Sequence, residues 1–152
     1  MADSNFSAQV SAWVANSKAA AEAVFHQAAQ TVVEEMQKTR AEGGNMPVDT
    51  GFLRASLMAS NDSMPTMRDP KPANAAAGSF AYSADTVNLV INGTPLGGKV
   101  YCGYVANYAN YVEMGTSKTP ARLFVTLAAQ RWPEIVKKAE EELLQRAGGS
   151  AS

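Results

Sequence analysis

The sequence predicts an α+β fold in which a long N-terminal helix and a kinked C-terminal helix pack on a small antiparallel sheet. Three observations indicate this fold: a first segment with helical spacing, a central region rich in Val, Ile, Tyr and Phe, and a helical last segment that one proline interrupts. The chain has 152 residues, enough for one domain with a modest core. We expect residues 1–147 to form that domain and residues 148–152 to form a flexible tail.

The first helix is expected from about Ser7 to Glu42, where the chain has neither proline nor glycine. Gly43 and Gly44 are expected to end it, because glycine adopts a left-handed conformation easily. A helix of this length measures about 50 Å, more than so small a domain covers. We therefore hypothesise that part of its apolar stripe faces another copy of the chain. The stripe repeats at steps of four and three: Val10, Val14, Ser17, Ala21, Val24, Ala28 and Val32.

The central region is expected to hold a short helical turn and the sheet. Asp49 or Thr50 would cap the turn, which leads into a strand near Ser56 to Ser60. Residues 61–77 contain three prolines and no periodic pattern, so they predict a long loop. The three runs that follow predict an antiparallel meander, with a glycine-rich turn at 93–98 before the last run; they are 78–84, 86–92 and 99–105.

The C-terminal third predicts two further helical segments. Residues 107–114 have helical spacing and a glycine stop at Gly115. The last helix is expected to begin near Pro120, since proline suits a first helical turn, and to run to Arg146. Pro133 predicts a kink or a restart after Trp132.

Composition excludes several classes of function. Charged residues make up 18% of the chain and the net charge is -1, so no basic field is present to bind nucleic acid through its phosphates. No secretory signal and no stretch of about 18 apolar residues is found, which indicates a protein made in the cytosol. Cys102 is the single cysteine, which excludes an intrachain disulfide and a zinc-thiolate cluster. We expect a reduced, half-buried thiol and no cofactor or metal.

Asp49-Thr50-Gly51 spells the tripeptide of aspartic proteases. Such an enzyme needs two aspartates that share a proton, each in a largely β framework. A single copy could suffice only in a homodimer of β-rich subunits, and here a long helix precedes the tripeptide. A helix cap is the favoured interpretation, and a protease is the alternative from another class of function.

Two further patterns imitate functional sites. Residues 93–99 have the spacing of a phosphate-binding loop, but Val100 stands where a Ser or Thr would bind magnesium, and a strand is expected to follow. A hairpin turn is the better interpretation. His26 is the only histidine and has no patterned acid, serine or cysteine beside it, so we expect a surface or interface side chain.

Two segments, "PVDTGFLRASL" (47–57) and "YANYVEMGTSKTPARLF" (108–124), occur in order around the predicted sheet. With a long helix before the first and a helix after the second, the chain resembles the gene-product-ten-like tail-component family of long-tailed bacteriophages. The resemblance covers about residues 8–146. The matching residues are Val48, Asp49, Thr50, Gly51, Leu53, Arg54 and Ser56 in the first segment, and Tyr108, Ala109, Tyr111, Val112, Glu113, Gly115, Thr116, Pro120, Ala121, Arg122 and Phe124 in the second.

The resemblance implies a structural neck protein without catalysis, also called a head–tail connector or tail-completion protein. It would be made in the host cytoplasm, assemble as or with a ring, and lie in the virion at the head–tail junction. Its implied partners are connector, terminator and tail-tube proteins, with genomic DNA nearby in the channel and no sequence-specific nucleic-acid or membrane binding. Leu123 departs from the pattern, because many relatives have a second proline there, and the loop at 61–77 is long for the family.

The motif residues are expected to be structural. Asp49 would cap the turn, Gly51 would allow the backbone to turn tightly, and Leu53 with Leu57 would enter the core. A hypothesis for the charged members, Arg54, Glu113 and Arg122, is that they form ion pairs or hydrogen bonds that fix the sheet against the helices or join neighbouring subunits; separate solvated charges are the alternative. A tail terminator or stopper of the same neck and a generic oligomeric adaptor remain competing functions.

Overall fold

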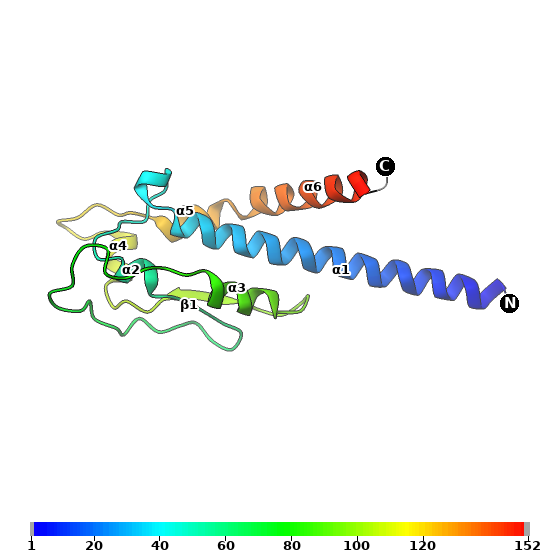
Figure 1. Cartoon of the computed structure of the whole chain (residues 1–152), viewed down its shortest axis with the longest axis horizontal. Coiled ribbons are helices and arrows are strands. Elements are labelled where there is room, and N and C mark those ends of the chain that lie inside the picture. Colours follow the sequence, from blue (N-terminus) through cyan, green and yellow to red (C-terminus); the bar gives the residue numbers. More distant parts are fainter. Residues whose placement is uncertain (1, 151–152) are drawn as a thin grey trace.

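The computed structural model describes residues 2–150 and has the expected α+β fold (Figure 1). A long N-terminal helix, a C-terminal helix and a two-stranded antiparallel sheet are its main parts. The elements in chain order are α1 (Ala2–Gln37), the 3-10 helix η1 (Arg40–Glu42), α2 (Phe52–Ala55), β1 (Leu57–Ser60), α3 (Asp85–Asn92), β2 (Tyr101–Tyr104), α4 (Ala109–Met114), α5 (Phe124–Gln130) and α6 (Trp132–Ser150).

Helix α1 ends at Gln37, so the predicted end near Glu42 is wrong. The chain becomes extended at Thr39, whose ψ is 167°, and Thr39 then forms a capping box with Glu42 that starts η1. Gly43, at φ 87°, ends η1 and not the long helix. Gly44 lies so close to α1 that an added Cβ would be 2.1 Å from the carbonyl oxygen of Lys38. The two glycines therefore close a tight turn after the helix.

The sheet consists of β1 and β2, which pair antiparallel with Leu57 opposite Tyr104. The predicted three-stranded meander is wrong: residues 78–84 form no strand, and residues 86–92 lie in α3. In α3, Val87 and Ile91 are buried one helical turn apart, while Leu89 is 75% exposed. A short apolar run fits both the repeat of a helix and the repeat of a strand, and here contact with the core favours the helix. Residues 61–77 form a long loop without helix or strand, as predicted.

Three helices follow β2 in the described part of the chain. Helix α4 ends at Gly115, as predicted. Helix α5 begins at Phe124 rather than near Pro120, after Leu123 takes the left-handed conformation at φ 52°. The helical segment breaks at Arg131, before Pro133, which confirms the predicted interruption. Helix α6 then extends to Ser150, beyond the predicted end at Arg146, and residues 151–152 of the predicted tail lie outside the described residues.

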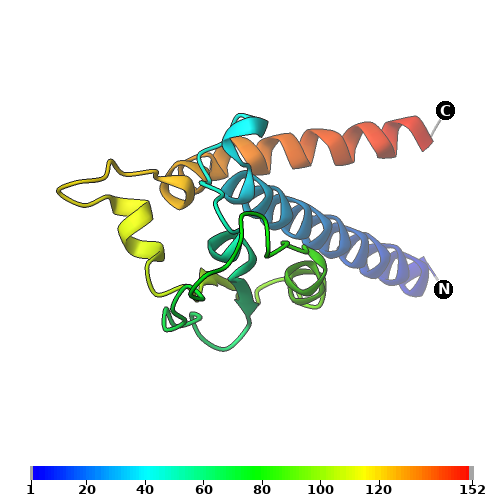
Figure 2. The same ribbon diagram turned by 60° about the vertical axis from the view of Figure 1, so that its left-hand side comes forward.

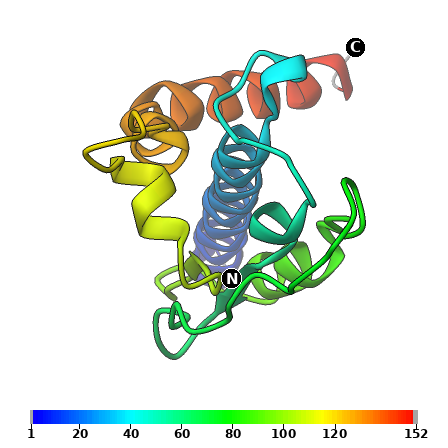
Figure 3. The same ribbon diagram turned by 90° about the vertical axis from the view of Figure 1, so that its left-hand side faces the viewer.

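The C-terminal half of α1 lies at the centre of the molecule. Helices α5 and α6 pack on one side of it, and the sheet and α3 lie on the other (Figures 2 and 3). A smaller cluster, formed by Ala28, Ile135 and Ala139, joins α1 to α6. The main core draws on nearly every element: Ala29, Val33, Met36, Met46, Leu53, Leu57, Val87, Ile91, Tyr104, Ala106, Ala109, Phe124 and Ala128.

The N-terminal half of α1 projects beyond this body (Figure 1). Residues 6–21 are exposed along its whole surface, whereas Ala28, Ala29 and Val33 are buried. Helix α6 runs alongside α1 near Ala28 and diverges from it toward the two chain ends. No helix among residues 2–150 combines the length and the apolar character needed to cross a bilayer.

Candidate functional site

The first motif forms a tight turn that leads into α2. Gly51 has φ 86°, and a Cβ there would be 2.1 Å from the carbonyl oxygen of Phe80, so only glycine fits. Thr50 is buried, and its Oγ1 accepts a hydrogen bond from the backbone N–H of Phe52 at 3.2 Å. The N-cap of α2 is Gly51, so the predicted cap by Thr50 is wrong, although Thr50 binds the backbone of this turn.

Asp49 does not cap the helix, so that prediction is wrong. Its side chain is 74% exposed, and its Oδ2 accepts a hydrogen bond from Lys71 Nζ at 2.6 Å. Lys71 belongs to the long loop, so the contact joins the loop to the turn. An aspartic protease would need a second carboxylate beside Asp49. Within this chain the side chain that contacts the Asp49 carboxylate is Lys71 instead.

Arg54 makes no ion pair among the described residues; it binds the end of α1 instead. Its Nε donates to the carbonyl oxygen of Gln37 at 3.0 Å, and its guanidinium carbon lies 5.5 Å from the centre of the Tyr82 ring. Gln37 Nε2 donates in return to the carbonyl oxygen of Arg54 at 2.9 Å. This reciprocal pair fixes α2 against the last turn of α1.

Gln37 joins three elements and was missed by the sequence analysis. It is 2% exposed, and its Oε1 accepts a hydrogen bond from the hydroxyl of Tyr104 on β2 at 2.8 Å. Burial raises the pKa of Tyr104, so the phenol stays protonated and remains a donor. Its partners lie 17 and 67 residues away, and no local pattern indicates them.

The second motif builds the joint between α4 and α5. Glu113 is buried, and its carboxylate accepts hydrogen bonds from the backbone N–H groups of Val125 at 2.9 Å and Thr126 at 2.8 Å. The hydroxyl of Thr126 also donates to it. Glu113 therefore caps the start of α5, where a negative charge is also favoured by the helix dipole. Glu113 thus forms the hydrogen bonds of the hypothesis and no ion pair among the described residues, but it joins α4 to α5 instead of the sheet to the helices.

The loop between α4 and α5 folds back on α4. Gly115 has φ 79°, and a Cβ there would be 2.6 Å from the backbone nitrogen of Ala121. Thr116 Oγ1 accepts a hydrogen bond from the backbone N–H of Thr119 at 3.1 Å, which closes the turn before the exposed Pro120. Arg122 joins α4 through its backbone N–H, which donates to Val112 at 3.0 Å, and its side chain has no ion pair among the described residues.

The two motifs meet in the core. The ring of Tyr108 stacks on Phe52 with centroids 6.4 Å apart, and Phe124 packs edge-on against Tyr104 at 5.2 Å. Leu53 and Phe124 are buried in the same cluster, which confirms the core role predicted for Leu53 and Leu57. Tyr111 differs from the other aromatic motif residues, because it is 63% exposed.

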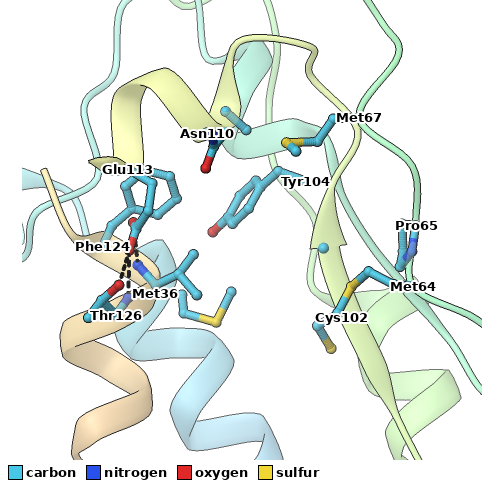
Figure 4. A pocket seen from close by; sticks show the side chains of 13 residues that line it. Met36, Met64, Pro65, Met67, Cys102, Tyr104, Asn110, Glu113, Phe124 and Thr126 are labelled. Carbon is cyan, nitrogen blue, oxygen red and sulfur yellow. Dashed lines mark hydrogen bonds between the residues drawn. The ribbon is translucent and has the colours of Figure 1, made fainter. Parts of the chain in front are cut away.

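A pocket of about 280 Å³ opens beside this joint (Figure 4). Most of its lining is apolar: Met36, Met64, Met67, Cys102, Tyr104 and Phe124. Glu113 lies at one end with its carboxylate turned toward Thr126. Burial raises the pKa of the Cys102 thiol, so it is protonated and a poor nucleophile at neutral pH. The expected half-buried thiol is thus confirmed. Among the described residues that line the pocket, no acid and base lie together as a catalytic pair would.

His26 and the glycine-rich segment pack on each other. His26 Nε2 lies 2.6 Å from the carbonyl oxygen of Thr94, and the backbone N–H of Leu96 donates to Glu22 at 3.2 Å. The segment follows α3 and leads into β2. It therefore lacks the following helix whose N-terminus binds the phosphate in a phosphate-binding loop. Among the residues searched, no group of His, Cys, Asp and Glu is arranged to hold a metal ion.

Comparisons with protein-family models, with curated proteins and with solved structures give no match to this chain. A functional assignment therefore depends on the two motifs and on the surface that the fold leaves uncovered.

Proposed function

We propose that the chain is a structural protein of a bacteriophage neck, where it assembles as or with a ring at the head–tail junction and completes the tail. It would be made in the host cytoplasm and act in the virion beside connector, terminator and tail-tube proteins. The proposal assigns it no chemistry and no cofactor.

One contrast carries the proposal: motif residues such as Leu53, Glu113 and Phe124 hold the fold together, whereas the projecting half of α1 exposes large apolar side chains. Glu113, Gly115 and Gly51 each satisfy a local structural requirement and leave no reactive group free. The projecting half of α1 exposes Phe6 and Trp13, each at 69%. Large exposed apolar surfaces of this kind are typical of interaction sites. A rigid scaffold with an apolar extension suits an assembly protein better than an enzyme.

The surface of α4 and its following loop is the proposed contact with neighbouring neck proteins. Tyr111 and Met114 are 63% and 62% exposed on α4, and residues 116–121 are exposed beside them. Tyrosine is enriched at protein interfaces, because its ring is apolar and its hydroxyl stays hydrated. Arg122 supplies a cation next to this surface.

Deletion of the gene from the phage that encodes it tests the proposal. We expect DNA-filled heads and separate tails, or tails with defective upper ends, in negative-stain micrographs, because capsid formation and DNA replication do not need a neck protein. Expression of the wild-type gene in trans should restore infectious particles. Normal particles from the deletion strain would refute the assignment.

A matched pair of variants tests the proposed contact surface in the same complementation assay. Tyr111→Glu places a charge on exposed α4, and Leu89→Glu places one on exposed α3. We expect Tyr111→Glu to fail and Leu89→Glu to restore particles. A purified protein with peptidase activity that Asp49→Asn abolishes would favour the protease instead.

A further inference from the structure

The N-terminal half of α1 is exposed, yet it carries few charges and several large apolar side chains. Its large apolar residues lie on one face: Phe6, Val10, Trp13 and Val14 are 69%, 43%, 69% and 38% exposed. Lys18 is the only charged residue between positions 6 and 21. A solvent-exposed helix normally carries charged residues on its outer face. This segment therefore has the character of a helix that another chain covers.

A groove continues this face toward the body of the molecule. It lies where α1 and α6 diverge and has a volume of about 530 Å³. Ala20, Ala21 and Val24 line it from α1, and Trp132, Val136 and Leu144 line it from α6. Glu140, the charged residue among those that line the groove, is exposed. The groove is thus apolar, with small side chains on its α1 side.

We propose that this groove binds the N-terminal segment of α1 from a second copy of the chain, in a reciprocal antiparallel pair. Along the face of α1, large residues come first and small ones follow at Ser17, Ala20 and Ala21. A twofold axis near residues 15 and 16 would place Val10 opposite Ala21 and Trp13 opposite Ser17 and Ala20 of the other copy. Large side chains then fill the positions where the facing helix has small ones, as close helix packing requires.

The reciprocal arrangement covers both exposed segments at once. A staggered parallel contact would cover the N-terminal segment of one copy and leave that of the other copy exposed. Further copies could then add to the exposed segment and form a filament. The paired region, residues 6–25, is about 30 Å long. Covering Phe6 and Trp13 of both copies, each 69% exposed, removes roughly 400–700 Å² of aromatic surface. That is about a third of the roughly 1,200–2,000 Å² that a stable interface buries, and the valines and the groove walls add to it.

The pair uses the projecting helix on which the proposed function also rests, but it needs no other neck protein. It uses α1 and α6 and leaves α4 and its loop free for other partners. Purified protein alone should form it, so failure of the pair and failure of the neck assignment are separate results.

Cysteine cross-linking of the full-length chain tests the register. In a Cys102→Ala background, the double variant Val10→Cys with Ala21→Cys should form a covalent dimer under mild oxidation, as seen on a non-reducing gel. Val10→Cys alone should not, because the two copies of residue 10 would lie about 16 Å apart along the antiparallel helices. A disulfide needs Cα atoms roughly 4.4–6.8 Å apart. Cross-linking by Val10→Cys alone would overturn the antiparallel arrangement.

Light scattering tests whether the exposed face forms the interface. The wild-type chain should be dimeric at tens of micromolar. Trp13→Glu should be monomeric with unchanged helix content by circular dichroism, because Trp13 has little contact within the subunit. Ala12→Glu adds the same charge on the opposite side of the helix and should leave the dimer intact. A monomeric wild-type chain, or two variants with equal mass, would overturn the proposal.

Discussion

The two halves of α1 differ in how much of their surface the rest of the chain covers. From Ala28 to Gln37 it is surrounded by α3, α5, α6 and the sheet, and its last residue binds α2 and β2. From Phe6 to Ala21 it contacts little of its own subunit. Both halves are rich in apolar and small residues. Similar apolar patterning thus occurs in the half of α1 that the chain covers and in the half that it leaves exposed.

The strongest test of this comparison replaces one aromatic residue in each region. Phe124 is 3% exposed in the body, so Phe124→Ala should lower the free energy of unfolding by about 3–5 kcal/mol. Trp13 is 69% exposed on the projecting half, so Trp13→Ala should change it by less than about 0.5 kcal/mol. Urea unfolding, at a concentration where light scattering shows monomers, measures both. Equal losses would show that the projecting half is packed against the body.

A second test concerns the cap that Glu113 forms on α5. Glu113→Ala removes the acceptor for two backbone N–H groups and should cost about 1–2 kcal/mol in urea unfolding. Arg122→Ala, on the same joint, should cost less than about 0.5 kcal/mol, because its side chain has no ion pair in the described part of the chain. Since the two residues are not partners, the charge-swapped double variant, Glu113→Arg with Arg122→Glu, should be no more stable than Glu113→Ala. Rescue would restore the ion-pair hypothesis.

The smallest expected effect concerns the ion pairs that join α1 to the break before α6. The hydrogen bond from Lys38 and the charge of Arg131, whose Nη1 lies 2.6 Å from Glu35, lower the pKa of Glu35. A lowered pKa stabilises the fold above the unfolded-state value of about 4.3, and this contribution is lost as the pH falls through the folded-state pKa. Glu35→Gln should therefore cost less than about 1 kcal/mol at pH 7, and this cost should decline as the pH is lowered below about 4.3. A cost that does not change with pH would point to packing instead of charge.

The sequence predicted the parts of the fold that depend on long or local signals. The long first helix, the loop at 61–77, the stop at Gly115 and the break near Pro133 were all predicted, because each follows from periodicity or from glycine and proline geometry. Helix α3 was mistaken for a strand, since a seven-residue apolar run fits both periods and contact with the core decides between them.

The sequence indicated the motif residues and the core role of Leu53, but not the contacts of Asp49 and Glu113. The two motifs meet in the core, but Asp49 binds a lysine 22 residues away instead of the adjacent helix. Glu113 likewise serves a helix that starts eleven residues later. Gln37 has partners on α2 and β2 that only the folded chain brings together. Capping rules describe neighbours in sequence, and these contacts depend on neighbours in space.

Leu123 shows how one backbone angle sets the direction of a helix. It has φ 52°, and α5 starts at the next residue. A proline ring fixes φ near -65°, so proline at this position could not adopt the angle that Leu123 has. Such a substitution would change the direction in which the chain enters α5 and would displace Phe124, α5 and the start of α6 together.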